Sequence, residues 1–443
     1  MSNLFYQTKS PRPMLDRADG IYMWDKNGKR YIDGSSGAMV SNLGHSDPAV
    51  LTAMRAQMDK STFGYRLHFQ TESSEDLARK TAALAPDGLN KVFFVSGGSE
   101  AVESTLKLAR QYVLMQGQPQ RFKVISRYPS YHGCTLGALA LTGYATMSAP
   151  FDPMMQRMPK IPAPRAYLDG RDMDDPSTGL HYANMLEAMI LQEGPNTVMA
   201  FIVEPVGGAS TGALVPPAGY MPRIREICTQ YGVLLIHDEV MTGGGRTGRF
   251  FGAEHWGTVP DLIAISKGFG AGYVPLGAMI ARDDLVDAVM EGGGFMHGFT
   301  YAGNPLACAA GAAVLDQIAK RDLVGNAERM GFLLQERLQG LMQRYSLIGD
   351  VRGKGLLMAF ELMADRATKA PLIPSLNAHS RLVDIAYDNG LIIYSRRTRG
   401  GTSGDHFLVC PPLITTEAQL NEITELLDLS LSQFMAELPA QVG

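Results

Sequence analysis

The sequence predicts an α/β protein with a doubly wound domain over residues 61–330. Strand-length apolar runs alternate with helical patterns through the middle of the chain, as in sheets covered by helices on both faces. Both ends of the chain carry shorter strand and helix signals, which together predict a smaller α+β domain formed by residues 1–60 and 331–443.

Continuous apolar runs in the middle of the chain predict buried strands. They lie at 122–126 (FKVIS), 197–203 (TVMAFIV), 233–236 (VLLI) and 262–265 (LIAI). Between the runs, Val102, Leu106, Ala109 and Val113 recur at steps of four, three and four. This spacing places the four side chains on one face of a helix, which we expect to pack in the core.

The two ends of the chain have their own local signals. Residues 20–33 show two strand-like pieces around Lys26-Asn27-Gly28, which is typical of a β-hairpin. Near the C-terminus, Thr416 and Gln419 have the spacing of a capping box at the start of a helix. The apolar face predicted for that helix contains Leu420, Ile423, Leu427 and Leu431.

The composition is that of an ordinary globular protein. Of the 443 residues, 45% are hydrophobic and 19% charged, and the formal net charge is −4. This charge disfavours nucleic acid or anionic membranes as partners, and we find no apolar run long enough to span a bilayer. The N-terminus does not resemble a secretory signal and the four cysteines form no metal-binding pattern. We therefore expect a cytoplasmic protein with no metal site.

Residues 96–100, with the sequence SGGSE, follow the apolar run KVFFV and begin the predicted helix. Ligands of α/β sheets bind beyond the carboxyl ends of strands, so polar residues there are candidates for function. Glycine lets backbone N–H groups approach an anion, and the helix dipole favours negative charge at the same place. For the segment alone, a turn followed by a helix cap is the simpler interpretation.

Two further candidate segments follow buried runs. The ring of Tyr131, in the sequence YHG, would stack on a flat ligand, although a structural tyrosine is the simpler interpretation of this residue alone. Asp238 and Glu239 follow the 233–236 run, where a buried carboxylate needs a partner. That partner is either a cationic group of a ligand, such as a protonated pyridine nitrogen, or a nearby arginine such as Arg246.

Lys267 follows the residues LIAIS and precedes a Gly-rich segment. Burial lowers the pKa of an amine and makes it nucleophilic toward aldehydes, although a single lysine at a strand end is usually structural. Together, the Gly/Ser turn, Tyr131, Asp238 and Lys267 supply the groups that pyridoxal phosphate (PLP) requires. The sequence therefore predicts a PLP-binding enzyme.

The chain resembles the class III aminotransferases, which are PLP-dependent transferases of fold type I, over nearly its whole length. The motifs that carry the resemblance are SGGSEA, SYHG, VEPVGG, HDEVMTGGGRTG, SKGFGAGYVPLGA and FTYAGNPLACAA. The resemblance implies a large domain with a mainly parallel, seven-stranded sheet between helices, and a small α+β domain from both termini.

The resemblance also implies roles for individual residues. Lys267 would carry PLP as an aldimine and move the proton, and Asp238 would pair with the pyridine nitrogen. The other residues expected to bind the cofactor are Gly98, Ser99, Tyr131, His132, Glu204 and Val240. Thr300 would reach the phosphate of the other subunit's cofactor, which implies a homodimer, or a tetramer, with sites at the interface.

The reaction implied by the resemblance is a ping-pong transfer of an amino group. An ω-amine or amino acid would be the donor, and a keto acid such as pyruvate the acceptor. A PLP-dependent dialkylglycine decarboxylase or aminomutase of the same fold is the alternative. A catalytically silent homologue is a third hypothesis, which the presence of both Asp238 and Lys267 disfavours.

Three positions bear on the substrate. Met39 stands where aromatic-amine transaminases often carry a tryptophan, and its flexible thioether predicts a pocket for flexible or longer substrates, unless it is only a packing difference. Tyr131 is a second candidate for substrate contact. The segment before GDHFLVCPPL contains several arginines, of which we predict that Arg397 binds the keto-acid carboxylate; a solvated surface charge is the alternative.

Overall fold

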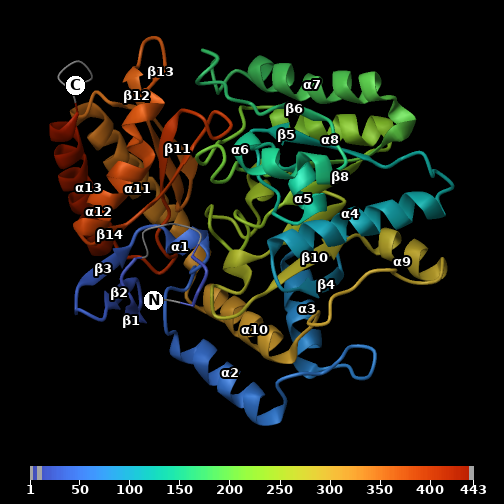
Figure 1. Ribbon diagram of the computed structural model, residues 1–443. Helices are drawn as coiled ribbons and strands as arrows, with labels where there is room; N and C mark the ends of the chain where they lie inside the picture. The colour runs from blue at the N-terminus through green and yellow to red at the C-terminus, as the bar shows by residue number, and fades with distance from the viewer. Residues whose placement is uncertain (1–2, 7–11, 439–443) are drawn as a thin grey trace.

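The computed structural model describes residues 3–6 and 12–438. A seven-stranded sheet forms the centre of the larger part, in the order β4-β10-β9-β8-β7-β5-β6 (Figure 1). Its strands are β4 (Lys91–Val95), β5 (Lys123–Tyr128), β6 (Lys160–Pro162), β7 (Val198–Val203), β8 (Leu234–Asp238), β9 (Leu262–Ile265) and β10 (Gly277–Ala281). β10 is antiparallel to both of its neighbours, and the other pairs are parallel. The predicted fold class is thereby confirmed.

Helices cover both faces of this sheet. Every residue of β7, β8 and β9 is buried, as the continuous apolar runs predicted. Because side chains alternate along a strand, Ala200 and Ile202 of β7 pack with α4 (Gly98–Met115) and α9 (Asp283–Glu291). Phe201 and Val203 pack on the other face with α7 (Pro176–Glu193) and α8 (Tyr220–Tyr231). The predicted stripe on α4 lies in this core, with Leu106 only partly buried.

The two ends of the chain meet in a second sheet. Its order is β1-β2-β3-β14, formed by β1 (Leu15–Asp19), β2 (Tyr22–Asp25), β3 (Arg30–Asp33) and β14 (Leu391–Ile392). β2 and β3 form the predicted hairpin, and β3 pairs in parallel with β14. Figure 1 accordingly shows the blue N-terminal strands beside the orange and red C-terminal elements. The domain boundaries themselves stay a prediction.

A third sheet lies in the C-terminal part, in the order β11-β12-β16-β15. Its strands are β11 (Ile348–Lys354), β12 (Leu357–Asp365), β15 (Tyr394–Arg397) and β16 (Asp405–Val409), with β13 (Ala370–Pro371) beside β12. The helices of this part are α11 (Leu323–Arg344), α12 (Ala378–Asp388) and α13 (Glu417–Glu437). Thr416 and Gln419 form the predicted capping box at the start of α13.

The remaining α-helices connect these sheets or lie on the large one. They are α1 (Ser36–Met39), α2 (Pro48–Lys60), α3 (Glu72–Leu84), α5 (Leu136–Leu141), α6 (Ala145–Ser148) and α10 (Pro305–Lys320). α10 contacts both α2 and α3. Within residues 3–6 and 12–438, no helix has the length and apolar character needed to cross a membrane.

Candidate active site

A cavity of about 290 Å³ lies beyond the carboxyl ends of β7, β8 and β9. This is the expected place for a ligand in a parallel sheet. The sequence-predicted residues that line it are Met39, Gly98, Ser99, Tyr131, His132, Glu204, Asp238, Val240 and Lys267. The structure therefore brings together residues that are more than 200 positions apart in the sequence.

Lys267 is the second residue after β9 and begins a short 3₁₀ helix. Its φ angle of 48° lies in the left-handed region, which is unusual for a residue with a side chain. Burial lowers the pKa of its amine, while the negative charges of Asp238 and Glu204 act in the opposite direction. A lowered pKa increases the fraction of neutral amine, which is the nucleophilic form.

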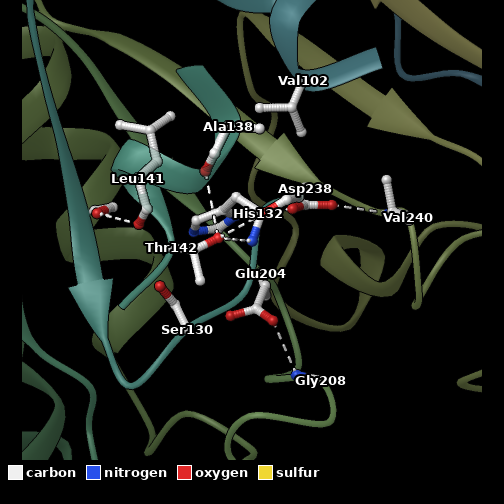
Figure 2. Close-up of polar contacts among 12 residues, drawn as sticks. Val102, Ser130, His132, Ala138, Leu141, Thr142, Glu204, Gly208, Asp238 and Val240 are labelled. Carbon is white, nitrogen blue, oxygen red and sulfur yellow. Dashed lines mark hydrogen bonds and ion pairs between the residues drawn. The ribbon is translucent and has the colours of Figure 1, made fainter. Parts of the chain in front are cut away.

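Asp238 ends β8 and is 5% exposed. Nδ1 of His132 lies 2.7 Å from its Oδ2, and the backbone N–H of Val240 donates to its Oδ1 at 3.1 Å (Figure 2). Arg246 instead donates to backbone carbonyls and to the side chains of Ser36 and Asn42. The hypothesis of a structural ion pair between this acidic segment and Arg246 is therefore wrong.

Glu239, the second carboxylate of the acidic pair, does not line the cavity. It accepts hydrogen bonds from the backbone N–H groups of Gly252 and Ala253 and from the hydroxyl of Thr242. Burial raises its pKa to about 7. Because successive residues of a strand point to opposite faces, only Asp238 of the two is presented to a ligand.

Glu204 follows β7 and faces the same cavity. Its Oε1 accepts the backbone N–H of Gly208 at 3.1 Å, and Nη2 of Arg127 lies 3.7 Å from its Oε2. Within the described chain, Oε2 has no hydrogen-bond partner. Burial raises the pKa of Glu204, although the charges of His132 and Arg127 lower it. Glu204 thus has an oxygen available for a polar group of a ligand.

The N-terminus of α4 forms another wall of the cavity. Among the described residues, no side chain caps the first turn of α4, so its N–H groups are suited to an anion. A Cβ atom on Gly98 would lie 2.8 Å from Cγ1 of Val240, which leaves room there for glycine only. Ser99 Oγ accepts the backbone N–H of Cys134 at 3.0 Å.

The chemistry of this donor set fits PLP. The uncapped turn at Gly98 and Ser99 suits its phosphate, and the amine of Lys267 suits its aldehyde. The Asp238 carboxylate suits a protonated pyridine nitrogen. Tyr131 and Val240 also line the cavity, and their aromatic and aliphatic side chains suit contact with a flat ring.

The structure does not bring Arg397 to the cavity. Its Nε donates to Oδ1 of Asp405 at 3.1 Å, and its Nη2 donates to the carbonyl oxygen of Pro374 at 2.9 Å. Arg396, its neighbour in β15, lines the cavity instead, with its guanidinium 4.6 Å from the centre of the Tyr394 ring. Alternation along the strand explains why the two arginines point to opposite sides.

Other cavity residues had no signal in the sequence. Tyr144, Met147, Ser210 and Tyr394 line the cavity, and none belongs to a strand-end motif; Met241, of the motif HDEVMTGGGRTG, lines it as well. The first four come from loops, from α6 and from an edge strand, so their proximity depends on tertiary structure.

Thr300, in contrast, is exposed and does not line the cavity of its own chain. Met39 is 2% exposed and has a positive φ of 58°.

Comparisons with known proteins identify the family of the chain. Residues 6–431 match the sequence profile of the family described as aminotransferase class-III. An uncharacterised aminotransferase of Bacillus subtilis is 38% identical over 419 residues, which cover 94% of each chain. A putrescine–pyruvate aminotransferase of Pseudomonas aeruginosa is 35% identical over 431 residues, which cover 96% of this chain and 92% of that protein.

The fold of the chain also matches that of a solved transaminase. The crystal structure of an amine transaminase from an uncultivated Pseudomonas species, in its PLP-bound form, has a TM-score of 0.90 and 35% identity. The match covers 98% of this chain and 99% of that chain. With the family match, the shared fold and a cavity whose groups fit PLP, the chain belongs to the class III aminotransferases and is a PLP-dependent transaminase.

Proposed function

We propose that the enzyme transfers an amino group from an ω-amine or amino acid to pyruvate by a ping-pong mechanism. One observation carries this proposal: Lys267, which is partly buried, and Arg396, which is exposed, line the same cavity. An amine nucleophile and a separate cation suit a keto acid, whose carbonyl must react while its carboxylate is bound.

PLP, when bound, supplies an electron sink for charge that develops on the substrate carbon. We assign the proton transfers to Nζ of Lys267, because its pKa is lowered. Nζ would move the proton from the substrate carbon to the former aldehyde carbon of the cofactor, and in the opposite direction in the second half of the reaction. Asp238, held by His132, would keep a proton on the pyridine nitrogen. Gly98 and Ser99 would bind the phosphate, and Glu204 would contact the phenolic oxygen and the substrate.

Arg396 replaces Arg397 in the proposed binding of the keto-acid carboxylate. A relative named for putrescine and pyruvate supports pyruvate as the acceptor. The side chains of Met39, Met147 and Met241 line the cavity, and such flexible thioethers adapt to donors of different shape. This wall favours an extended or flexible amine.

A homodimer is part of the proposal. Thr300 is exposed and lies outside the cavity of its own chain, as a residue that contributes to a second subunit's site would. Light scattering on the holoenzyme tests this, and a monomer that is fully active would contradict it.

The donor is tested by a screen with pyruvate as the acceptor. It covers taurine, β-alanine, putrescine, phenylethylamine and long-chain amines, with formation of alanine as the readout. We expect turnover that requires the keto acid. Release of carbon dioxide from a disubstituted amino acid would favour a decarboxylase, and turnover without a keto acid would favour an aminomutase.

The attachment residue is tested separately by borohydride reduction of the holoenzyme and peptide mapping. We expect the label on Lys267, and Lys267→Ala should lose it. Lys160→Ala is the matched control, because Lys160 also has a pKa lowered by burial but lies outside the cavity. A label on another lysine in the wild-type enzyme would show that the assignment of Lys267 is wrong.

A further inference from the structure

Tyr144 contacts the strand that carries Arg396. Its side chain is 6% exposed and lines the cavity. The hydroxyl donates to the backbone carbonyl of Arg397 at 2.9 Å and accepts the backbone N–H of the same residue at 3.3 Å. The backbone N–H and the backbone C=O of Arg397 are therefore both satisfied by a single side chain.

The contact with Tyr144 lies at the outer edge of the third sheet. β15 is an edge strand, so every second residue turns its backbone N–H and C=O away from the sheet. Thr398 bonds inward, to the carbonyl of Gly404 at 2.8 Å, and Arg397 faces outward. Such groups need a partner where water is excluded, and Tyr144 provides it.

The turn that follows β15 rests on the same segment. A Cβ atom on Gly401 would lie 2.2 Å from Oγ1 of Thr146 and 2.9 Å from Cε1 of Tyr144. Thr398 also donates to Oε1 of the buried Glu361 at 3.1 Å. The backbone that follows Arg396 is thus held at Arg397, at Thr398 and at the tip of the turn.

The side chain of Arg396 forms no ion pair with any residue that the structure describes. Apart from its place over the Tyr394 ring, it donates to the backbone carbonyl of Ser395 at 3.2 Å, and the residue is exposed. A guanidinium of this kind can turn from the ring toward a carboxylate without movement of the strand.

We propose that Tyr144 is a positioning residue for the keto-acid half of the reaction. Its hydroxyl fixes the backbone at Arg397, so that Arg396 faces the cavity and binds the carboxylate by rotation of its side chain alone. The role rests on the proposed function of Arg396. It is confined to substrates with a carboxylate, because Tyr144 acts through Arg396.

The test compares two acceptors that differ in the carboxylate, pyruvate and butanal, with Tyr144→Phe holoenzyme. Loss of the two hydrogen bonds should raise the KM of pyruvate about three- to tenfold, and leave the KM of butanal and both kcat values within about twofold. Calorimetry with propionate, which has the carboxylate but no keto group to react, should show the same loss in affinity. Gly401→Ala, which pushes the turn away from Tyr144, should act in the same direction.

Tyr345→Phe is the matched control. Its hydroxyl also makes two hydrogen bonds, to the carbonyl and carboxylate of Asp428, but it does not line the cavity. The ratio of the KM of pyruvate to the KM of butanal should stay at the wild-type value in this variant.

Arg396→Ala separates this proposal from the function on which it rests. If Arg396→Ala leaves the KM ratio unchanged, the carboxylate role of Arg396 and the positioning role of Tyr144 both fail. If Arg396→Ala weakens pyruvate selectively but Tyr144→Phe does not, only the positioning role is overturned. When Tyr144→Phe is combined with Arg396→Ala, it should raise the KM of pyruvate no further. An additive increase would also overturn the positioning role of Tyr144.

Discussion

Nδ1 of His132 lies 2.7 Å from Oδ2 of Asp238, and both side chains are almost fully buried. The backbone N–H of His132 donates in turn to Oγ1 of Thr142 at 3.0 Å. The carboxylate at the end of β8 is thus held by a residue from the loop after β5. A buried carboxylate with a fixed direction is already oriented before a cation of the ligand approaches it.

The first prediction concerns this pair. His132→Ala should weaken PLP binding roughly tenfold or more, because it leaves the buried Asp238 carboxylate without one of its hydrogen bonds. The dissociation constant is measured by absorbance titration of the apoenzyme with PLP. His181→Ala, at an exposed histidine, is the control and should bind PLP as the wild type does. If His132→Ala bound PLP as tightly as His181→Ala does, His132 would not support Asp238.

The second prediction concerns the glycine turn before α4. Gly98→Ala should weaken PLP binding roughly fivefold to a hundredfold, because the new Cβ would meet Cγ1 of Val240 at 2.8 Å and displace it. Gly97→Ala is the control, since its Cβ would have no atom within 4 Å. The same absorbance titration applies. A Gly97→Ala variant as weak as Gly98→Ala would mean that the contact with Val240 is not the cause.

Five of the seven strands of the large sheet and the strand-end residues could be predicted from the sequence because each depends on local pattern, whereas β6 and β10 were not predicted. The run at 262–265 has the bounds of β9, and Lys267 follows it as expected. Which arginine reaches the cavity could not be predicted, since one position along β15 reverses the direction of the side chain. The partner of Asp238 was missed for a related reason: His132 lies 106 positions away and meets it only through packing.

The third prediction concerns the pH dependence of stability. His237 is completely buried, and burial, followed by the charge of Arg225, lowers its pKa to about 3. The unfolded chain, with a histidine pKa near 6.5, takes up a proton that the folded protein excludes as the pH falls from 6.5 toward 3. The free energy of unfolding therefore decreases across this window because of His237, and at pH 5 it is about 2 kcal/mol below its value above pH 6.5.

His237→Phe should accordingly flatten the pH dependence. The melting temperature of the apoenzyme is measured at pH 8 and pH 5 for each variant, and the difference is compared. Any constant cost of the phenylalanine cancels in that difference. Exposed His181→Phe should keep the wild-type difference. A His237→Phe variant that loses as much stability on acidification as the wild type would assign the acid sensitivity to other groups.

The last prediction separates the two neighbouring arginines. Arg396→Ala should raise the KM of pyruvate about ten- to a hundredfold, which is the loss expected for hydrogen bonds between charged groups. Its effect on the melting temperature should be small, because Arg396 is exposed. Arg397→Ala should instead lower the melting temperature and change the KM of pyruvate little, since Arg397 pairs with the fully buried carboxylate of Asp405.

Burial opposes ionisation of Asp405, yet hydrogen bonds from His379 and Arg397 keep the pKa of its carboxyl below its usual value. Removal of Arg397 leaves this charge with His379 as its remaining side-chain partner, at a cost of about 1–3 kcal/mol in stability. The KM of pyruvate should change little, because the backbone of Arg397 still binds Tyr144. If Arg397→Ala instead weakened pyruvate selectively while Arg396→Ala did not, the carboxylate site would belong to Arg397, and its ion pair with Asp405 would have to open during turnover.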